Sequence, residues 1–232
     1  MSGRVGSITT GIIADGLIFN MDAANRASTE PISTVTTSFN TINLTESGSF
    51  SDNGIFDSST ITPSYAFGGT DDDISLNTTL LSGLSSYTIS SWASFSNFTT
   101  NNPIASNWYS GVTNYILRSI QGGSGIRLWS STVGNVAKST TYSITLSTDT
   151  WYNIVGLYDG SAISLYLNGV QVGTPTATSG AVLSNTNKGS IGKTHLDAYY
   201  AGNISNIQFY NRALSSTEIL HNYNALKGRF GL

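Results

Sequence analysis

The sequence predicts an all-β fold: a two-sheet antiparallel sandwich that carries one short C-terminal α-helix. Short runs of aromatic and β-branched residues alternate with turns of Gly, Asn, Asp and Ser, which is the pattern of many short strands. Charged residues make up only 10% of the chain, against about 25% in a typical soluble protein. No repeat of about 20–50 residues is visible, which argues against a solenoid or a propeller. Because 232 residues fit one large β domain, we expect a single domain over residues 1–232, with residues 1–14 as an N-terminal arm.

Composition also limits the functions open to the chain. It contains no cysteine, which excludes disulfides, thiolate metal sites and cysteine catalysis. A net charge of −3 provides no basic surface, so no nucleic-acid partner is expected. No apolar run approaches the roughly 18 residues that span a bilayer, so no membrane insertion is expected. Residues 1–7 lack the charged-then-apolar pattern of a secretory signal, and we expect a protein made in the cytoplasm and not exported by the usual route.

The first part of the chain carries the weaker strand signals. Residues 11–22 predict one or two strands that tie the N-terminal end into the sandwich. Residues 26–62 are rich in Thr, Ser and Asn with little apolar support, so we expect short edge strands between long loops. Residues 64–76 predict two short strands around a Gly- and Asp-rich turn.

Residues 87–95 predict a central strand. Four apolar side chains alternate onto one face of the pleat, while Trp92 takes the other face. The four are Tyr87, Ile89, Ala93 and Phe95. A strand that is apolar on both faces is typical of the middle of a sheet rather than its exposed edge.

Residues 115–120 and 125–129 predict an antiparallel pair, because the connector at 121–124 has the composition of a turn. Trp129 lies in this second strand, as Trp92 and Trp151 lie in theirs. We therefore expect all three tryptophans in the core.

The strongest local signal is a β-hairpin at Asn168-Gly169. A type I′ turn needs positive φ at both central residues, and Asn-Gly is the pair that adopts it most readily. The flanking residues 163–167 and 170–172 alternate in polarity. The register set by this turn pairs Leu167 with Val170, Leu165 with Val172, and Tyr166 with Gln171. The two leucine pairs share one face, which we expect to be core, and Tyr166 and Gln171 face solvent or a second surface.

Residues 216–227 predict the helix. Ser215 and Glu218 form a capping box, in which Ser215 is the N-cap and Glu218 reaches back to it. Leu214 and Ile219 are placed to form a hydrophobic staple around this cap. The apolar stripe expected to face the sandwich consists of Ile219, Leu220, Tyr223 and Leu226. Lys227 and Gly228 match the usual C-terminal stop.

Taken in order, these segments resemble the concanavalin A-like jelly roll, in its laminin-G-like and pentraxin-like branch. Each motif is weak alone, but their order and spacing from about residue 15 to 226 are specific. The matching segments are residues 66–72, 87–92, 151–160, 165–170 and 202–215, running into 218–219. The resemblance implies a fold that usually binds or coats rather than catalyses.

A narrower resemblance concerns the two ends. Residues 16–25 and 223–232 are similar to the ends of such domains in bacteriophage virion proteins. This implies a role on the particle surface, as capsid decoration, fibre or adhesin, with a virion location. The absent signal peptide agrees, since a virion protein leaves the cell by lysis. The partners implied are other virion proteins, further copies of the chain as a homo-oligomer, and host cell-surface glycans.

Enzymatic interpretations find little support. The glucanases of this fold carry closely spaced carboxylates on one strand, because glycoside hydrolysis needs two acidic groups across the sugar. The chain has three glutamates, Glu30, Glu46 and Glu218, and none lies in such a cluster. His195 and His221 lie in no nucleophile motif, and on the helix we favour a surface or partly packed His221. No catalytic residue is assigned.

Calcium is the cofactor to consider, since several relatives bind it. Asp71, Asp72 and Asp73 form the one acidic cluster, and Asp197 would complete a site if its loop folds nearby. Hard oxygen ligands for Ca²⁺ have this appearance, but so does an Asp-rich turn that binds its own backbone amides. We favour the turn, because no complete calcium motif is present.

Two aromatic pairs in polar loops are candidates for glycan binding. Sugar sites commonly place an aromatic face under the ring and add hydrogen bonds from Asn or Asp. The candidates are Asn107, Trp108 and Tyr109 in one loop, and Tyr199 and Tyr200 in another. The alternative is that these rings close the ends of the sandwich or form an oligomer interface, and we favour it because buried aromatics dominate cores and interfaces.

Three functional hypotheses remain from the sequence. The first is a non-enzymatic phage virion surface protein built on a lectin-like domain. The second is a free carbohydrate-binding lectin or adhesin module, either dependent on calcium or independent of it. The third, a degenerate glycosidase, is disfavoured by the missing carboxylates.

Overall fold

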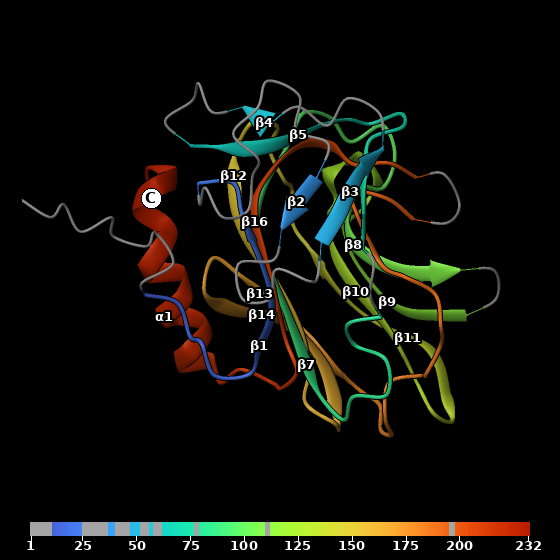
Figure 1. The fold of residues 1–232 in the computed structure, drawn as a ribbon. Coiled ribbons are helices and arrows are strands. Elements are labelled where there is room, and N and C mark those ends of the chain that lie inside the picture. The colour runs from blue at the N-terminus through green and yellow to red at the C-terminus, as the bar shows by residue number, and fades with distance from the viewer. Residues whose placement is uncertain are drawn as a thin grey trace, which may run out of the picture.

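The computed structural model confirms a two-sheet antiparallel sandwich of the jelly-roll type, flanked by one described α-helix (Figure 1). The structure describes both backbone and side chains for most of the chain. It describes the backbone alone for three short strands in the first quarter and for residues 109, 112, 113 and 136. The described ranges are 11–24, 37–39, 47–51, 56–57, 62–76, 79–109, 112–194 and 198–232.

The first sheet contains the longest strands and lies next to the helix. All its pairings are antiparallel, and β16 is bordered by β7 on one side and by β5 and β1 on the other. In spatial order the strands are β14 (Val170–Ala177), β13 (Ala162–Leu167), β12 (Trp151–Tyr158), β7 (Tyr87–Phe95), β16 (Ala201–Tyr210), β5 (Ser64–Gly68) and β4 (Phe56–Asp57), with β1 (Leu17–Asp22) paired to β16. The central position predicted for residues 87–95 is therefore confirmed.

The second sheet packs against the first. Its β9 and β10 are the antiparallel pair predicted from residues 115–129, joined by a short 3₁₀ turn, Gln121–Gly123. In spatial order its strands are β11 (Asn135–Ser143), β10 (Gly125–Thr132), β9 (Val112–Ser119), β8 (Pro103–Tyr109), β15 (Ser190–Ile191), β6 (Asp73–Leu76), β3 (Ser47–Ser51) and β2 (Thr37–Phe39). The predicted strands in residues 64–76 are β5 and β6, so the turn between them carries the chain from one sheet to the other.

The core lies between the two sheets. Side chains from both inner faces, such as Ile89 and Phe209 on the first sheet and Leu117 and Leu128 on the second, form one buried cluster. Burial of this apolar surface is the main term that stabilises the fold. Trp92 is also fully buried but is absent from this cluster, in keeping with its predicted place on the opposite face of β7.

The Asn168-Gly169 hairpin forms with the predicted register. Asn168 and Gly169 have φ of 50° and 80°, as a type I′ turn requires. Leu165 is fully buried, whereas Val170 at the tip is 62% exposed, so the apolar face is core only away from the turn. Tyr166 on the other face joins a second apolar cluster, beneath the helix.

The helix α1 (Ser216–Leu226) begins at the predicted capping box and covers the outer face of the first sheet (Figure 1). Ile219 is buried against β12 and β13, but Leu220 is 43% exposed and Asn222 is buried instead. The α-helix ends at Leu226 with Lys227 as its C-cap, within one residue of the predicted end. The chain continues as the 3₁₀ turn η3 (Lys227–Phe230), and Gly231, with φ of 73°, takes the left-handed conformation.

The C-terminal turn is fastened to the first sheet. Phe230 stacks on Trp92 with ring centroids 4.0 Å apart. Arg229 forms two hydrogen bonds of 2.9 Å with the buried carboxylate of Asp22 on β1. The two ends of the described chain are thereby joined on one face.

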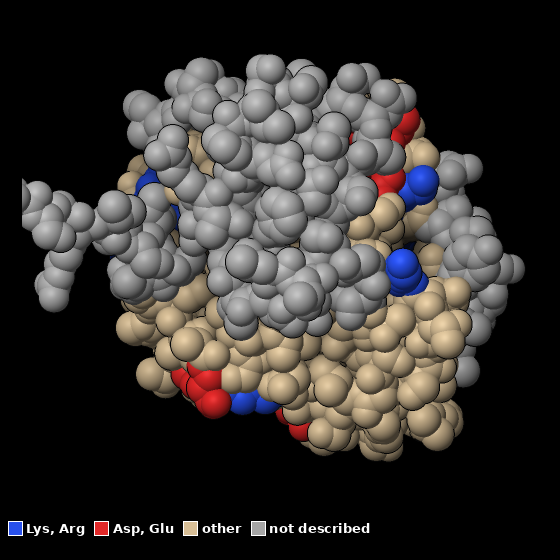
Figure 2. Space-filling view, viewed as in Figure 1, with Lys and Arg blue, Asp and Glu red and all other residues tan. Residues whose placement is uncertain are grey.

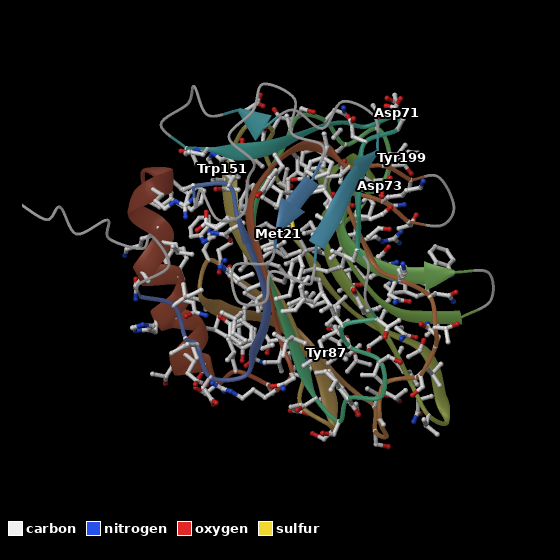
Figure 3. The ribbon with its side chains drawn as sticks, in the orientation of Figure 1. Met21, Asp71, Asp73, Tyr87, Trp151 and Tyr199 are labelled. Carbon is white, nitrogen blue, oxygen red and sulfur yellow. The ribbon has the colours of Figure 1, made fainter. Side chains whose placement is uncertain are left out.

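Of the three tryptophans expected in the core, Trp92 is fully buried and the other two are not. Trp129 and Trp151 are only partly buried, because each lies on the outer face of its sheet. Figure 3 shows Trp151 beside the helix, where its ring contacts Phe230 at 5.0 Å. Of the helices that the structure describes, none is long and apolar enough to cross a membrane.

Candidate functional site

The first glycan-binding candidates lie at the end of β8, and the structure separates them. Asn107 is buried, and its side chain donates to the carbonyl of Asn187 at 2.7 Å and accepts from Asn185 at 3.1 Å. It therefore joins the strand to the 185–187 loop and does not face solvent. Trp108 is partly exposed at the strand end, and of Tyr109 the backbone alone is described, paired with Val112. Of the side chains described in this group, Trp108 is the one that keeps exposed surface.

The second candidate pair, Tyr199 and Tyr200, points in two directions. Tyr200 is fully buried, its hydroxyl donates to the carbonyl of Ser94 at 2.8 Å, and its ring meets Phe67 edge-on at 5.6 Å. Burial raises the pKa of the Tyr200 hydroxyl well above its ordinary value. Tyr200 is thus a core residue, and its assignment to a sugar site is corrected. Tyr199 remains partly exposed, with the Lys193 ammonium 4.9 Å from its ring centroid.

The three adjacent aspartates form a turn. Asp72 is buried and accepts a hydrogen bond from the backbone amide of Gly68, while the exposed Asp71 accepts from the Thr70 hydroxyl. Asp73 is buried, accepts from Ser75 at 2.7 Å, and lies 3.9 Å from the ammonium of Lys193. These contacts are those of the Asp-rich turn favoured from the sequence.

These contacts do not bring the three aspartates together as ligands of a calcium ion. Across the described residues, no three His, Asp or Glu side chains gather in a way that could hold a metal ion. Asp197, the fourth proposed ligand, and His195 lie outside the described residues. Figure 3 shows Asp71, Asp73 and Tyr199 at one end of the molecule, where Lys193 contacts both Asp73 and Tyr199.

Sequence reasoning missed a cluster on the outer face of the second sheet. Arg118 on β9 and Arg127 on β10 are directly opposite each other in the ladder, and both guanidinium carbons lie 5.9 Å from the ring centroid of Trp129. The spacing Arg127-x-Trp129 puts both side chains on one face of a strand. Extending the register of the two strands from the turn at 121–124 would have placed Arg118 on the same face, opposite Arg127.

The carboxylates with described contacts serve the structure. Asp22 pairs with Arg229, and Asp159 accepts hydrogen bonds from Ser161 and Ala162 in its own turn. Glu218 binds Arg212 at 2.7 Å and completes the capping box. Glu30 and Glu46 lie outside the described residues. His221 is exposed, as favoured from the sequence, with a ring nitrogen against the carbonyl of Gly11.

A comparison of the sequence with known protein families gives independent information on the fold. A laminin-G-like family model, described as the concanavalin A-like lectin/glucanases superfamily, matches residues 67–220. The chain belongs to this superfamily. The superfamily assignment made from the sequence motifs is confirmed by this match, which spans both sheets and enters the helix. No sequence among curated proteins matches the chain.

Solved structures share the fold at low sequence identity. The ligand-binding domain of botulinum neurotoxin serotype D in complex with N-acetylneuraminic acid has a TM-score of 0.69 and 17% identity over 94% of this chain and 52% of that one. Domain 4 of AbnA, an extracellular arabinanase from Geobacillus stearothermophilus in complex with arabinotriose, has a TM-score of 0.60 and 20% identity over 89% and 98%. A Trypanosoma rangeli sialidase has a TM-score of 0.65 and 13% identity over 92% and 33%. The chain spans about half the length of the neurotoxin domains it matches.

Proposed function

We propose that this lectin-like domain is a non-catalytic module that binds carbohydrate. The observation that carries the proposal is the pairing of a lectin-like fold with outward-facing, partly exposed aromatic side chains. Trp108, Trp129 and Tyr199 lie in strands or loops of the second sheet and its rim, where a sugar ring can approach them. Aromatic faces of this kind supply the apolar contact in sugar sites.

The roles of the acidic residues support a binding function over a hydrolytic one. Glycoside hydrolysis requires two carboxyl groups held across the scissile bond. Asp22, Asp159 and Glu218 are instead engaged in ion pairs or turns. Two structures of similar fold are a neurotoxin domain with N-acetylneuraminic acid and an arabinanase domain with arabinotriose. The same role is proposed here for a single chain of similar size to the arabinanase domain.

We further propose that the module is carried on a bacteriophage particle, as head decoration, fibre or adhesin. The support is the similarity of residues 16–25 and 223–232 to phage virion domains. In the described structure these end segments are coupled through the Asp22–Arg229 ion pair. The partners proposed are neighbouring virion proteins, further copies of the chain, and glycans on the host cell.

A glycan array tests the binding proposal. The intact protein is expected to be retained by at least one glycan class, and Trp108→Ala or Trp129→Ala to weaken that retention, because each removes an exposed aromatic face. Reducing sugar is assayed over the same polysaccharides. Release of reducing ends would replace the binding module with a glycosidase, and retention by no glycan would end the proposal.

Mass spectrometry of purified particles tests the virion proposal separately. The protein should be present, with high copy number for head decoration and low copy number for a fibre or tail protein. Its absence from particles, together with glycan binding by the free protein, would favour the second candidate, a free lectin.

A further inference from the structure

The cluster at Trp129 places two positive charges where a sheet would ordinarily avoid them. Arg118 and Arg127 are directly opposite neighbours across β9 and β10. Like charges in that position repel and lower the stability of the sheet. Leu117 and Leu128, which are adjacent to the arginines in sequence, belong to the core. Because adjacent residues of a strand face opposite sides, both arginines lie on the outer face of the second sheet.

Neither arginine has an acidic partner in the described chain. All four described ion pairs involve other cations, namely Lys193, Arg212 and Arg229. The Arg118 side chain donates no hydrogen bond to any described residue, and its Nε is shielded from solvent without an acceptor. The Nε1 of Trp129 is likewise a shielded donor without a described acceptor. The cluster thus combines two positive charges that have no described carboxylate partner with two shielded donors that have no described acceptor.

The cluster is also held in place. The Nε of Arg127 donates to the Thr141 hydroxyl on β11 at 2.8 Å, which restrains the guanidinium. Arg118 lies over the indole at the same 5.9 Å as Arg127. Burial, and then the charge of Arg127, hold the pKa of the Arg118 guanidinium below its ordinary value. An anion at this point would relieve the repulsion that lowers it.

The surroundings make this charge pair distinctive. The chain has 10 Lys and Arg residues and a net charge of −3, so it has no general attraction for polyanions. On the face that Figure 2 shows, the described surface is mostly uncharged, with blue and red atoms in a few small groups. An anion that binds at the cluster is therefore selected by local geometry.

We propose that Arg118, Arg127 and Trp129 form a subsite for an acidic sugar, in which the two guanidinium groups bind an oxyanion of the sugar and its ring lies against the exposed part of Trp129. This deepens the proposed carbohydrate-binding function and rests on it. Guanidinium groups bind carboxylate and sulfate through paired, charge-assisted hydrogen bonds. Carboxylate and sulfate share this chemistry, and a uronic acid or a sulfated sugar would supply it.

A purely structural role for the cluster makes a different prediction. Cation–π contacts of the two arginines with Trp129 could by themselves stabilise the sheet. If that were their whole role, replacing either arginine would change thermal stability and leave ligand affinity alone. The subsite requires the opposite, with affinity lost and the fold kept.

Isothermal titration of the intact protein with three probes tests the subsite. The probes are an oligogalacturonate, the same oligosaccharide with its carboxyl groups methyl-esterified, and an oligosaccharide that carries sulfate groups but no carboxyl groups. Arg118→Gln and Arg127→Gln are each expected to weaken binding of the acidic probe by about tenfold or more. Lys138→Gln is the matched control, because Lys138 is an exposed cation on the neighbouring β11 and its loss should leave affinity within about twofold. Melting temperatures of all variants report on folding.

The outcomes separate the subsite from the broader function. Tight binding of the oligogalacturonate assigns a carboxylate, and tight binding of the sulfated probe alone assigns a sulfate. The subsite is overturned if the esterified probe binds as tightly as the better of the two charged probes, if Lys138→Gln loses as much affinity as the arginine variants, or if an oligonucleotide competes through the same arginines. Glycan binding that neither arginine affects would leave the proposed function standing without this subsite. Retention of no glycan at all would remove both.

Discussion

Glu218 uses its charge to fix the start of the helix. Its carboxylate accepts from the backbone amide of Ser215 at 2.8 Å and forms two hydrogen bonds with Arg212. The Arg212 guanidinium and the Ser215 amide lower the pKa of Glu218 to about 2. Because the ionised form is the stabilising one, its contribution is complete above the ordinary value near 4.5 and is lost as pH falls toward 2.

Replacing this carboxylate should therefore flatten the acid limb of the stability curve. Glu218→Gln is expected to lower the free energy of unfolding at pH 7 by about 1 kcal/mol, the usual size of a capping contribution. Between pH 4.5 and 2 the variant should lose less stability than the parent. Urea unfolding at several pH values measures both. Asp149→Asn, at an exposed carboxylate, serves as control; equal acid sensitivity in parent and Glu218→Gln would contradict the assignment.

The aspartate turn gives a second test at the residue scale. Asp72→Ala is expected to destabilise the fold by about 1–2 kcal/mol, because it leaves the Gly68 amide without its acceptor. Asp71→Ala, at the exposed neighbour, should cost less. Since the turn needs no ion, a chelator should leave the melting temperature of every form unchanged. A drop on chelation, reversed by calcium, would restore the metal site that the sequence left open.

Among the elements, the Asn168-Gly169 hairpin has the most sharply defined requirement. Gly169 has φ of 80°, and a Cβ there would lie 3.0 Å from that of Tyr223 on α1. Gly169→Ala should thus cost more than about 1 kcal/mol of unfolding free energy, since its native conformation is incompatible with alanine. Gly228→Ala is the matched control, because a Cβ there meets nothing within 4 Å and its φ is not positive. That variant should be neutral or slightly stabilising in thermal melts. Equal losses at both positions would argue against the hairpin contact.

Elements specified by near neighbours could be predicted from the sequence. The hairpin register follows from two turn residues, and the helix start follows from Ser215 and Glu218. The 3₁₀ turn after the helix could not be predicted, because Phe230 packs on Trp92 of a distant strand. Packing between segments far apart in the chain decided that outcome.

At the scale of the whole molecule, the candidate site was the harder prediction. Alternation places Trp129 on a face of β10 but does not say whether that face is covered. Within the described ranges, the first sheet alone has a helix over its outer face. Tyr199 and Tyr200 differ in the same way, since adjacent residues on an extended segment point to opposite sides. Which side is core depends on both sheets at once.

The two outer faces consequently differ in exposure. The first is closed by α1 and by Phe230, whereas the second keeps Trp129 and its two arginines partly exposed. A binding module requires one such open face on a rigid support, and the sandwich provides it. The virion setting would add the means of display.

Calorimetric titration with the oligosaccharide that the array selects, followed by recovery of that ligand, tests the central claim most directly. The account predicts saturable heat at a single class of site and an oligosaccharide recovered at its original length. Absence of saturable heat, or recovery of shorter fragments, would contradict a non-catalytic carbohydrate-binding module.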